Sequence, residues 1–272
     1  MSEEISITTS NNKKFNGVYL EGSKDKPAVI YVHGMLGDYK TPNFVNNLKE
    51  ELFKNNIAYL ATDNRGEGEN SRNELLEEAH LDITADIEFL IDKGYNKIIL
   101  IGHSAGTVKV VRYLFEGEFK NNIAKLILIA PIDPLGGRIA HGRNNIEEFL
   151  KRAQEKKDQG KGDEMITSEF DHDDVSYKTF ISWYKRDDFG RMFEFCNKEY
   201  DFPILSQIKI PVKVIAGTKD EYLHPSNPER PEEAMKILSK HIKDFDYKIV
   251  EGSGHNFNGF ENELVKEIIK FI

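Results

Sequence analysis

Cysteine is almost absent from this sequence, since the 272 residues include only Cys196. One cysteine cannot form a disulfide within the chain, which fits a reducing compartment. Its surroundings, FEFCNKEY, contain no signature of a cysteine nucleophile, so we expect a buried structural thiol. The acidic, polar start, MSEEISITTS, lacks the basic end and apolar run of a secretory signal. Together these features predict a cytoplasmic protein.

Long apolar runs and an excess of positive charge are also missing. No stretch reaches the roughly 18 apolar residues that a membrane-spanning helix needs, so no membrane span is expected. The 37 Lys and Arg residues are outnumbered by 46 Asp and Glu residues, which gives a formal charge of -9. This charge repels phosphate backbones and argues against nucleic acid as a partner. The sequence also contains no metal-ligand cluster and no nucleotide loop, so we expect neither a metal nor a cofactor.

What the chain does contain is an alternation of short Val- and Ile-rich runs with segments of helical spacing. This alternation is typical of parallel strands covered by helices, an α/β fold. Thr41 and Pro42 predict a capped helix start with a first-turn proline. The first two strands look like a hairpin, and we expect eight strands in all, at residues 5–10, 15–20, 28–32, 58–62, 98–101, 126–130, 212–216 and 247–250.

One segment, residues 134–205, departs from this alternation because no parallel strand is predicted there. It is crowded with charge, as in KRAQEKKDQGKGDE, but it is too rich in aromatic residues, including Trp183, for a disordered linker. A chain of this length can bury its core in one domain. We therefore expect a core formed by residues 1–133 and 206–272, interrupted by a helical insertion at 134–205.

The strongest functional signal is a pentapeptide, GHSAG, centred on Ser104. It reads as G-x-S-x-G directly after the apolar run IILI and directly before the helix-like run TVKVVRYLF. A serine at such a strand-to-helix turn is held in a strained conformation, and small flanking residues are needed for close approach of the chain. We interpret Ser104 as a nucleophile. The alternative is a glycine-rich turn without chemistry.

A serine nucleophile needs a base and a group that orients that base. Asp220 lies just beyond a predicted strand in VIAGTKDEY, and His255 follows the next strand in IVEGSGHNF. The order Ser, Asp, His is the one that this strand-turn-helix arrangement requires. Asp133, in LIAPIDP, also follows a strand, and Glu221 is adjacent to Asp220, so both remain alternatives for the acid.

Backbone amides near the nucleophile are expected to stabilise the negative oxygen of a tetrahedral intermediate. One belongs to Ala105, the residue after the serine, and the other to Met35 in HGMLG, which follows the predicted strand VIYVHG. A plain glycine turn is the alternative for HGMLG. We also expect His103 and Trp183 to contact substrate, although Trp183 could instead pack the insertion onto the main domain.

Taken together, HGMLG, DNRGEGEN, GHSAG and the loops of Asp220 and His255 resemble the α/β-hydrolase superfamily. The resemblance implies a mostly parallel eight-stranded sheet flanked by helices, and a mainly structural role for the D-x-R-G-x-G turn at residues 63–68. The strand-to-helix turn that carries the nucleophile is called the elbow. Haloalkane dehalogenases and epoxide hydrolases carry aspartate at this position, so the serine found here disfavours those activities. HGMLG also lacks the HGGPG of proline iminopeptidases and the HGGG of one large esterase and lipase group.

The HGxxG loop looks more like that of cap-bearing serine esterases, including cinnamoyl and feruloyl esterases and monoacylglycerol lipases. This resemblance implies hydrolysis of small to medium carboxylic esters, with the insertion as a cap. Thioesterase, lipase or acyltransferase activity would use the same triad, and a carbon–carbon hydrolase is a further alternative. A non-catalytic binding protein on this fold is the alternative from a different class.

Overall fold

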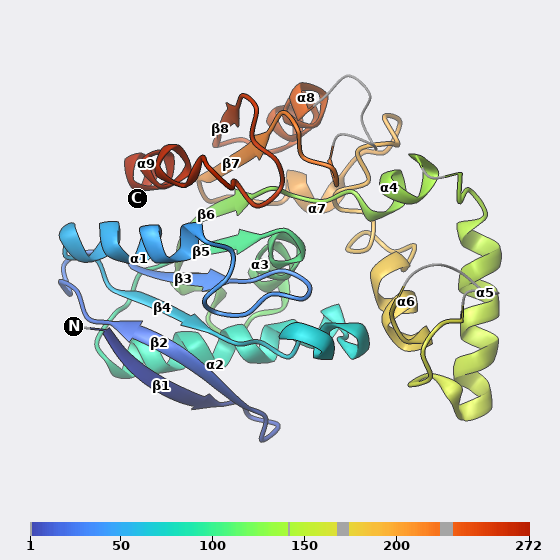
Figure 1. Ribbon diagram of the computed structural model, residues 1–272, viewed down its shortest axis with the longest axis horizontal. Coiled ribbons are helices and arrows are strands. Elements are labelled where there is room, and N and C mark those ends of the chain that lie inside the picture. The colour runs from blue at the N-terminus through green and yellow to red at the C-terminus, as the bar shows by residue number, and fades with distance from the viewer. Residues whose placement is uncertain (1, 141, 168–173, 224–230) are drawn as a thin grey trace.

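Among the described residues, eight strands form one sheet in the order β1-β2-β4-β3-β5-β6-β7-β8 (Figure 1). The computed structural model describes residues 2–140, 142–167, 174–223 and 231–272. The two pairings among β1, β2 and β4 are antiparallel, and all others are parallel, which confirms the predicted fold class. The strands are β1 Ser2–Thr8, β2 Lys14–Leu20, β3 Ala28–Val32, β4 Tyr59–Thr62, β5 Ile98–His103, β6 Ile123–Ile129, β7 Val212–Gly217 and β8 Phe245–Val250.

Helices cover both faces of this sheet, which is why β3, β4, β5 and β7 are buried along their whole length. One face packs against α1 Phe44–Lys54 and α9 Glu261–Phe271. The other face packs against α2 Ala79–Asp92, α3 Ala105–Glu116 and α8 Pro231–His241. Alternate residues of one strand serve the two cores, as with Val29 and Ile30 of β3.

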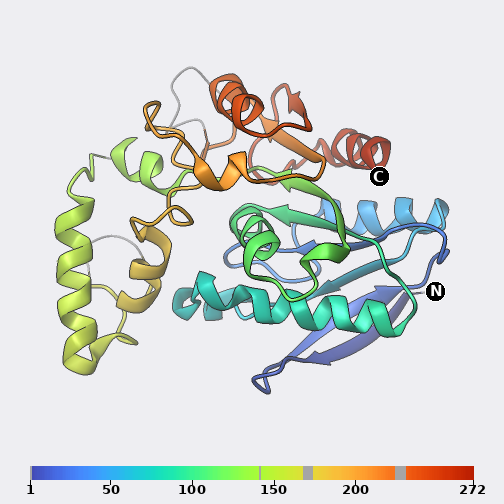
Figure 2. The same cartoon turned by 180° about the vertical axis from the view of Figure 1, so that it is seen from behind.

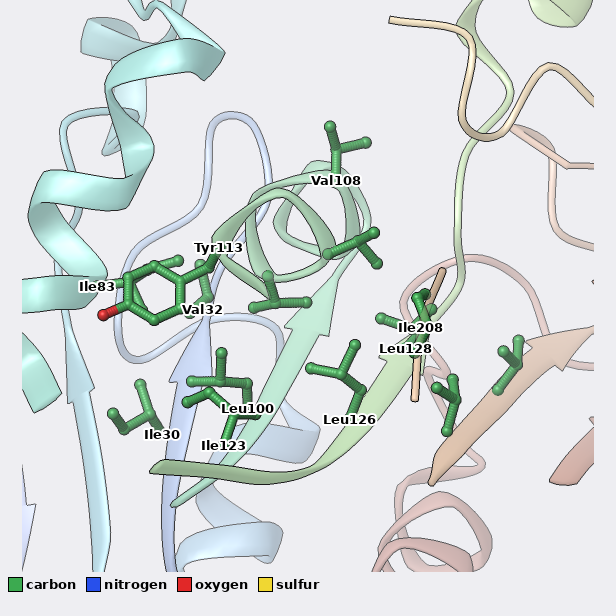
Figure 3. Packing of buried hydrophobic residues seen from close by; sticks show 14 of the residues in the cluster. Ile30, Val32, Ile83, Leu100, Val108, Tyr113, Ile123, Leu126, Leu128 and Ile208 are labelled. Atoms are coloured by element: carbon green, nitrogen blue, oxygen red, sulfur yellow. The ribbon is translucent and has the colours of Figure 1, made fainter. Parts of the chain in front are cut away.

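Figure 3 shows the second of these cores, in which strand side chains meet those of α2 and α3. Leu100 of β5 and Leu126 of β6 lie in the same cluster as Tyr113 of α3. This packing anchors α3 along the sheet, so the first residue of α3 has a defined position at the end of β5. Short 3₁₀ turns complete the connections, at Gly68–Asn73, Leu76–Glu78 and Lys120–Asn122.

The predicted start of the first helix is wrong. The helix begins at Phe44, after Asn43, and no side chain caps its first turn. The hydroxyl of Thr41 instead accepts a hydrogen bond from the amide of Asp38 at 3.1 Å. Thr41 therefore closes a tight turn before the helix, a competing local use of a short hydroxyl side chain.

Between β6 and β7 the described chain consists of helices and turns. These are α4 Pro134–Ala140, α5 Ile146–Lys156, a π turn at Lys157–Lys161, α6 Tyr177–Tyr184 and α7 Pro203–Ser206. Both views place α5 and α6 beside each other and away from the sheet (Figures 1 and 2). They share a small hydrophobic cluster that includes Ile146, Ala153 and Phe180. None of the described helices has the length and apolar character needed to cross a bilayer.

Candidate active site

Ser104 occupies the sharp turn between β5 and α3 predicted from its sequence context. Its φ is 56° and its ψ is -125°, a conformation that non-glycine residues rarely adopt. A Cβ on Gly102 would lie under 3.0 Å from the carbonyl of Gly106, and a Cβ on Gly106 would lie equally close to that of Val32. Only glycine therefore fits at either position. The turn leaves Ser104 half-buried, and its Oγ makes no hydrogen bond to any described residue.

His255 and Asp220 form a hydrogen-bonded pair beyond the ends of β8 and β7. The Nδ1 atom of His255 lies 2.9 Å and 3.0 Å from the two carboxylate oxygens of Asp220, and the acid is fully buried. One of these oxygens also accepts the amides of Tyr222 and Leu223, at 2.9 and 3.3 Å. Because a carboxylate only accepts, Nδ1 carries the proton, and Nε2 is left as the basic nitrogen.

His103, the residue before Ser104, connects the elbow to the His255 loop. Its Nε2 donates to the backbone carbonyl of His255 at 3.1 Å, and the two rings lie 5.1 Å apart. Burial and the nearby His255 lower the pKa of His103 to about 3, so the ring is neutral. The His103 ring is buried and its Nε2 is bound to the protein, so its predicted contact with substrate stays a prediction.

The HGMLG loop lies directly against the elbow. A Cβ on Gly34 would lie 2.7 Å from the Cβ of Ser104 and 3.2 Å from the amide nitrogen of Ala105. The amides of Ala105 and Met35 donate to no residue in the described part of the chain. Ala105 is also the first residue of α3, where the helix dipole favours negative charge. This arrangement suits stabilisation of an oxyanion beside Ser104.

Asp133, an alternative for the acid, is engaged elsewhere. Its carboxylate accepts the amides of Gly136 and Cys196, both at 2.8 Å, and burial raises its pKa to about 6. It thereby connects the first turn of α4 to the turn that contains Cys196. Cys196 was expected to be buried, but it is half-buried. Burial and Asp133 raise the pKa of its thiol, which argues against a reactive cysteine.

Glu221, the other alternative, approaches His255 only at the backbone. One of its carboxylate oxygens accepts the His255 amide at 3.4 Å, whereas Asp220 is bound to the imidazole itself. The hydrogen bonds of the described residues therefore favour Asp220 as the partner of the ring.

Trp183, on α6, lies in the larger hydrophobic core, which also includes side chains of α3. Its side chain is 8% exposed and belongs to the same cluster as Val108 of α3 and Leu76. The preceding hydroxyl, on Ser182, accepts the Leu76 amide at 2.9 Å and strengthens this packing. This placement favours the packing alternative over substrate contact.

Tyr222 was missed by the sequence analysis. Its ring centroid lies 4.5 Å from that of His255, although the side chain is 55% exposed. Its position two residues after Asp220 was the available signal.

Two surface grooves, of about 440 and 350 Å³, lie away from these residues, and their linings include none of Ser104, Asp220 and His255. The described residues hold no group of three or more His, Cys, Asp and Glu side chains suited to a metal ion.

Comparisons with known proteins find esterases among the similar chains. The curated protein "Putative esterase/lipase 2" of Mycoplasma pneumoniae is 22% identical over 280 residues, covering 97% of this chain and 95% of that protein. The solved Pyrococcus furiosus esterase Pf2001 matches with a TM-score of 0.64 at 20% identity, covering 100% of this chain and 90% of that chain. Est1E from Butyrivibrio proteoclasticus, solved with ferulic acid, matches with a TM-score of 0.69 at 18% identity, covering 98% and 97%.

At such identities the solved structures establish the fold alone. A family model described as "Serine aminopeptidase, S33" (Hydrolase_4) matches residues 23–262, which is most of the sequence. The strand order and the elbow at the end of β5 are those of the α/β-hydrolase fold. This chain therefore belongs to the S33 serine aminopeptidase family of α/β hydrolases.

Proposed function

We propose that the protein hydrolyses small to medium carboxylic esters through an acyl-enzyme on Ser104. The observation that carries this proposal is the His255–Asp220 hydrogen-bonded pair, joined to the elbow through His103. Acyl transfer requires a base oriented by an acid, which the His255–Asp220 pair provides, and an accessible serine, which the strained and half-buried Ser104 provides.

In the first half of the proposed reaction, Nε2 of His255 takes the proton of Ser104 as Oγ attacks the ester carbonyl carbon. The carbonyl oxygen becomes negative, and the amides of Ala105 and Met35 donate to it. The tetrahedral intermediate then collapses, the C–O bond to the alcohol breaks, and His255 returns the proton to the leaving alcohol. Asp220 stays ionised and stabilises the imidazolium.

In the second half, His255 removes a proton from water, and the resulting hydroxide attacks the acyl carbon. Collapse of the second intermediate releases the carboxylic acid and returns the proton to Ser104. Each step of this proposed reaction is a proton transfer or an acyl transfer, and each is assigned to a residue of the chain. Transfer of the acyl group to an alcohol would use the same steps with a different second nucleophile.

We further propose that residues 134–205 act as a cap and that the core consists of residues 1–133 and 206–272. Met35 supports this division, because its partly buried side chain packs against both the main core and the α5–α6 cluster. The cap would then meet the site at the oxyanion loop itself. Side chains from this junction would select the substrate, since pockets are lined mainly by apolar groups.

The names of the relatives support an ester as the substrate class. The Mycoplasma protein is named an esterase/lipase, the Pyrococcus protein is named an esterase, and the Butyrivibrio protein was solved with bound ferulic acid. The family description instead names an aminopeptidase. Amides and thioesters therefore belong in the test beside esters.

A fluorophosphonate probe tests the nucleophile directly. Wild-type protein should be labelled at Ser104, and Ser104→Ala should not be labelled while remaining folded. A panel of p-nitrophenyl esters of increasing acyl length, with a thioester and an aminoacyl anilide, should then show the highest kcat/KM for an ester. An unlabelled, folded wild-type protein would support the non-catalytic alternative, and faster anilide cleavage would reassign the substrate class.

A further inference from the structure

Lys109 is a buried charge in the helix that begins at the elbow. It lies in the second turn of α3, and its side chain is 0% exposed. Its Nζ lies 2.6 Å from a carboxylate oxygen of Glu74, whose side chain is also 0% exposed, and donates to Oδ1 of Asn64 at 2.9 Å. A buried ion pair often stabilises a fold no more than apolar residues of the same shape would. Stability alone therefore gives no reason for this pair at this position.

Asn64 connects Lys109 to the HGMLG loop. The Lys109 ammonium and the Gly66 amide can only donate, and both donate to Oδ1 of Asn64 at 2.9 Å. Together they orient the Asn64 side chain so that Nδ2 faces the carbonyl of His33, at 3.4 Å. The Asn64 backbone amide donates to Nε2 of His33 at 3.1 Å. The backbone and the side chain of Asn64 thus each make one hydrogen bond to His33, and Lys109 helps to orient that side chain.

His33 in turn fixes a peptide unit of the HGMLG loop. Since Nε2 accepts, the proton is on Nδ1, which donates to the carbonyl of Gly34 at 2.8 Å. Burial and the Lys109 ammonium lower the pKa of His33 to about 3, so this neutral tautomer persists across the working pH range. The Gly34 carbonyl belongs to the peptide unit whose nitrogen is the Met35 amide. Fixing that carbonyl therefore fixes the direction of the Met35 N–H.

We infer that Lys109, paired with Glu74, is a positioning residue that aims the Met35 amide at the oxyanion through Asn64 and His33. The inference rests on the proposed function, because it assigns that amide to the transition state. An interaction realised only in the tetrahedral state affects kcat more than KM. A purely structural role for Lys109 would change stability without this split.

The double variant Lys109→Met/Glu74→Gln tests the inference, because it removes both charges and leaves neither one buried alone. We expect kcat for the best ester to fall roughly 10- to 100-fold, as for a misplaced catalytic group, with KM changed less than about threefold. The affinity for an alkyl boronic acid, which forms a tetrahedral adduct on the serine, should fall by a similar factor. Lys213→Met is the matched control, since Lys213 is a buried lysine of β7 paired with Asp246, remote from the elbow.

Asn64→Ala provides a second route if the double variant does not fold. It removes the side-chain bonds to Lys109 and His33, and it keeps the Lys109–Glu74 pair and the backbone bond from Asn64 to His33. It should produce the same loss of kcat. The ¹H–¹⁵N resonances of Gly34 and Met35, and the ¹⁵N shifts of the His33 ring, should also move in both variants and stay in place in Lys213→Met. This readout needs no turnover, so it tests the positioning even if wild-type protein cleaves no ester. Folded variants with unchanged kcat and unchanged Met35 resonances would overturn the inference.

Discussion

Nδ1 of His255 contacts both carboxylate oxygens of Asp220, at 2.9 and 3.0 Å, although the two residues are 35 positions apart. The contact exists because β7 and β8 are parallel neighbours, so the loops after them emerge at the same edge of the sheet. β5, which carries the elbow, runs parallel in the same sheet and ends at that edge as well. The proposed triad is therefore a direct product of strand order.

Asp220→Asn should lower kcat by about 10⁴, the loss given for the equivalent change in a serine protease, because an amide favours the wrong imidazole tautomer. Steady-state kinetics with a p-nitrophenyl ester measure this loss. Asp133→Asn is the control and should retain most of the activity, since Asp133 binds the amides of Gly136 and Cys196. The reverse ranking of the two variants would assign the acid to Asp133.

Gly106→Ala should unfold at lower urea concentration than wild type, because the added Cβ would meet the carbonyl of Val32 at under 3.0 Å. Overpacking of this kind costs about 1–3 kcal/mol, and more when backbone has to move. Gly137→Ala in α4 is the control, because its Cβ would have nothing within 4 Å and alanine favours a helix. Equal stabilities for the two variants would contradict the close approach at the elbow.

His103 should make the stability of the protein depend on pH. Its pKa is about 3 in the folded state and 6.5 as the reference for the unfolded chain, so only the unfolded chain binds this proton in between. The stabilisation from His103 is thus complete above pH 6.5 and is lost as pH falls from 6.5 toward 3. Relative to His103→Gln, wild type should lose on the order of 2 kcal/mol between pH 7.5 and pH 5, at about 1.4 kcal/mol per pKa unit. Urea unfolding at both pH values measures the difference.

Asp133→Asn supplies the comparison of opposite sign for this measurement. The pKa of Asp133 is about 6 in the folded state against a reference of 3.8, so the folded protein binds the proton more tightly. Wild type should therefore gain stability relative to Asp133→Asn as pH falls from 6 toward 3.8. The difference in unfolding free energy between wild type and variant should thus change with pH in opposite directions for His103→Gln and Asp133→Asn. If it changed in the same direction for both, the assigned burial of one of the two groups would be wrong.

Trp183→Ala should destabilise the protein by about 3–5 kcal/mol, as expected for loss of a buried tryptophan, and leave the ranking of ester substrates unchanged. Tyr222→Ala should do the opposite, because its ring is exposed and its centroid lies 4.5 Å from that of His255. Thermal unfolding and the ester panel separate the two effects. A changed ranking for a stable Trp183→Phe protein would return Trp183 to the substrate site.

Much of the fold follows from local patterns in the sequence. Runs such as AVIYV and IILI are short and continuously apolar because both faces of a covered sheet are buried, and this made their assignment as strands possible. The elbow was equally readable, since GHSAG joins a strand run to a helix run. The first helix start was misjudged because Thr41 can bond to a nearby backbone amide in a turn as well as in a cap.

The sequence by itself determined the sheet, the elbow and a short set of polar residues after strands, because these depend on residue types within a few positions of one another. It predicted Asp220 as the acid and left Asp133 and Glu221 as alternatives, because each follows a strand and local pattern does not reveal which strands are neighbours. Only the tertiary structure decided that β7 lies beside β8 and that Asp220 faces His255. The same holds for the pairing of Lys109 with Glu74. The two residues are 35 positions apart, and no local sequence pattern indicates that folding will bury both charges in contact with each other.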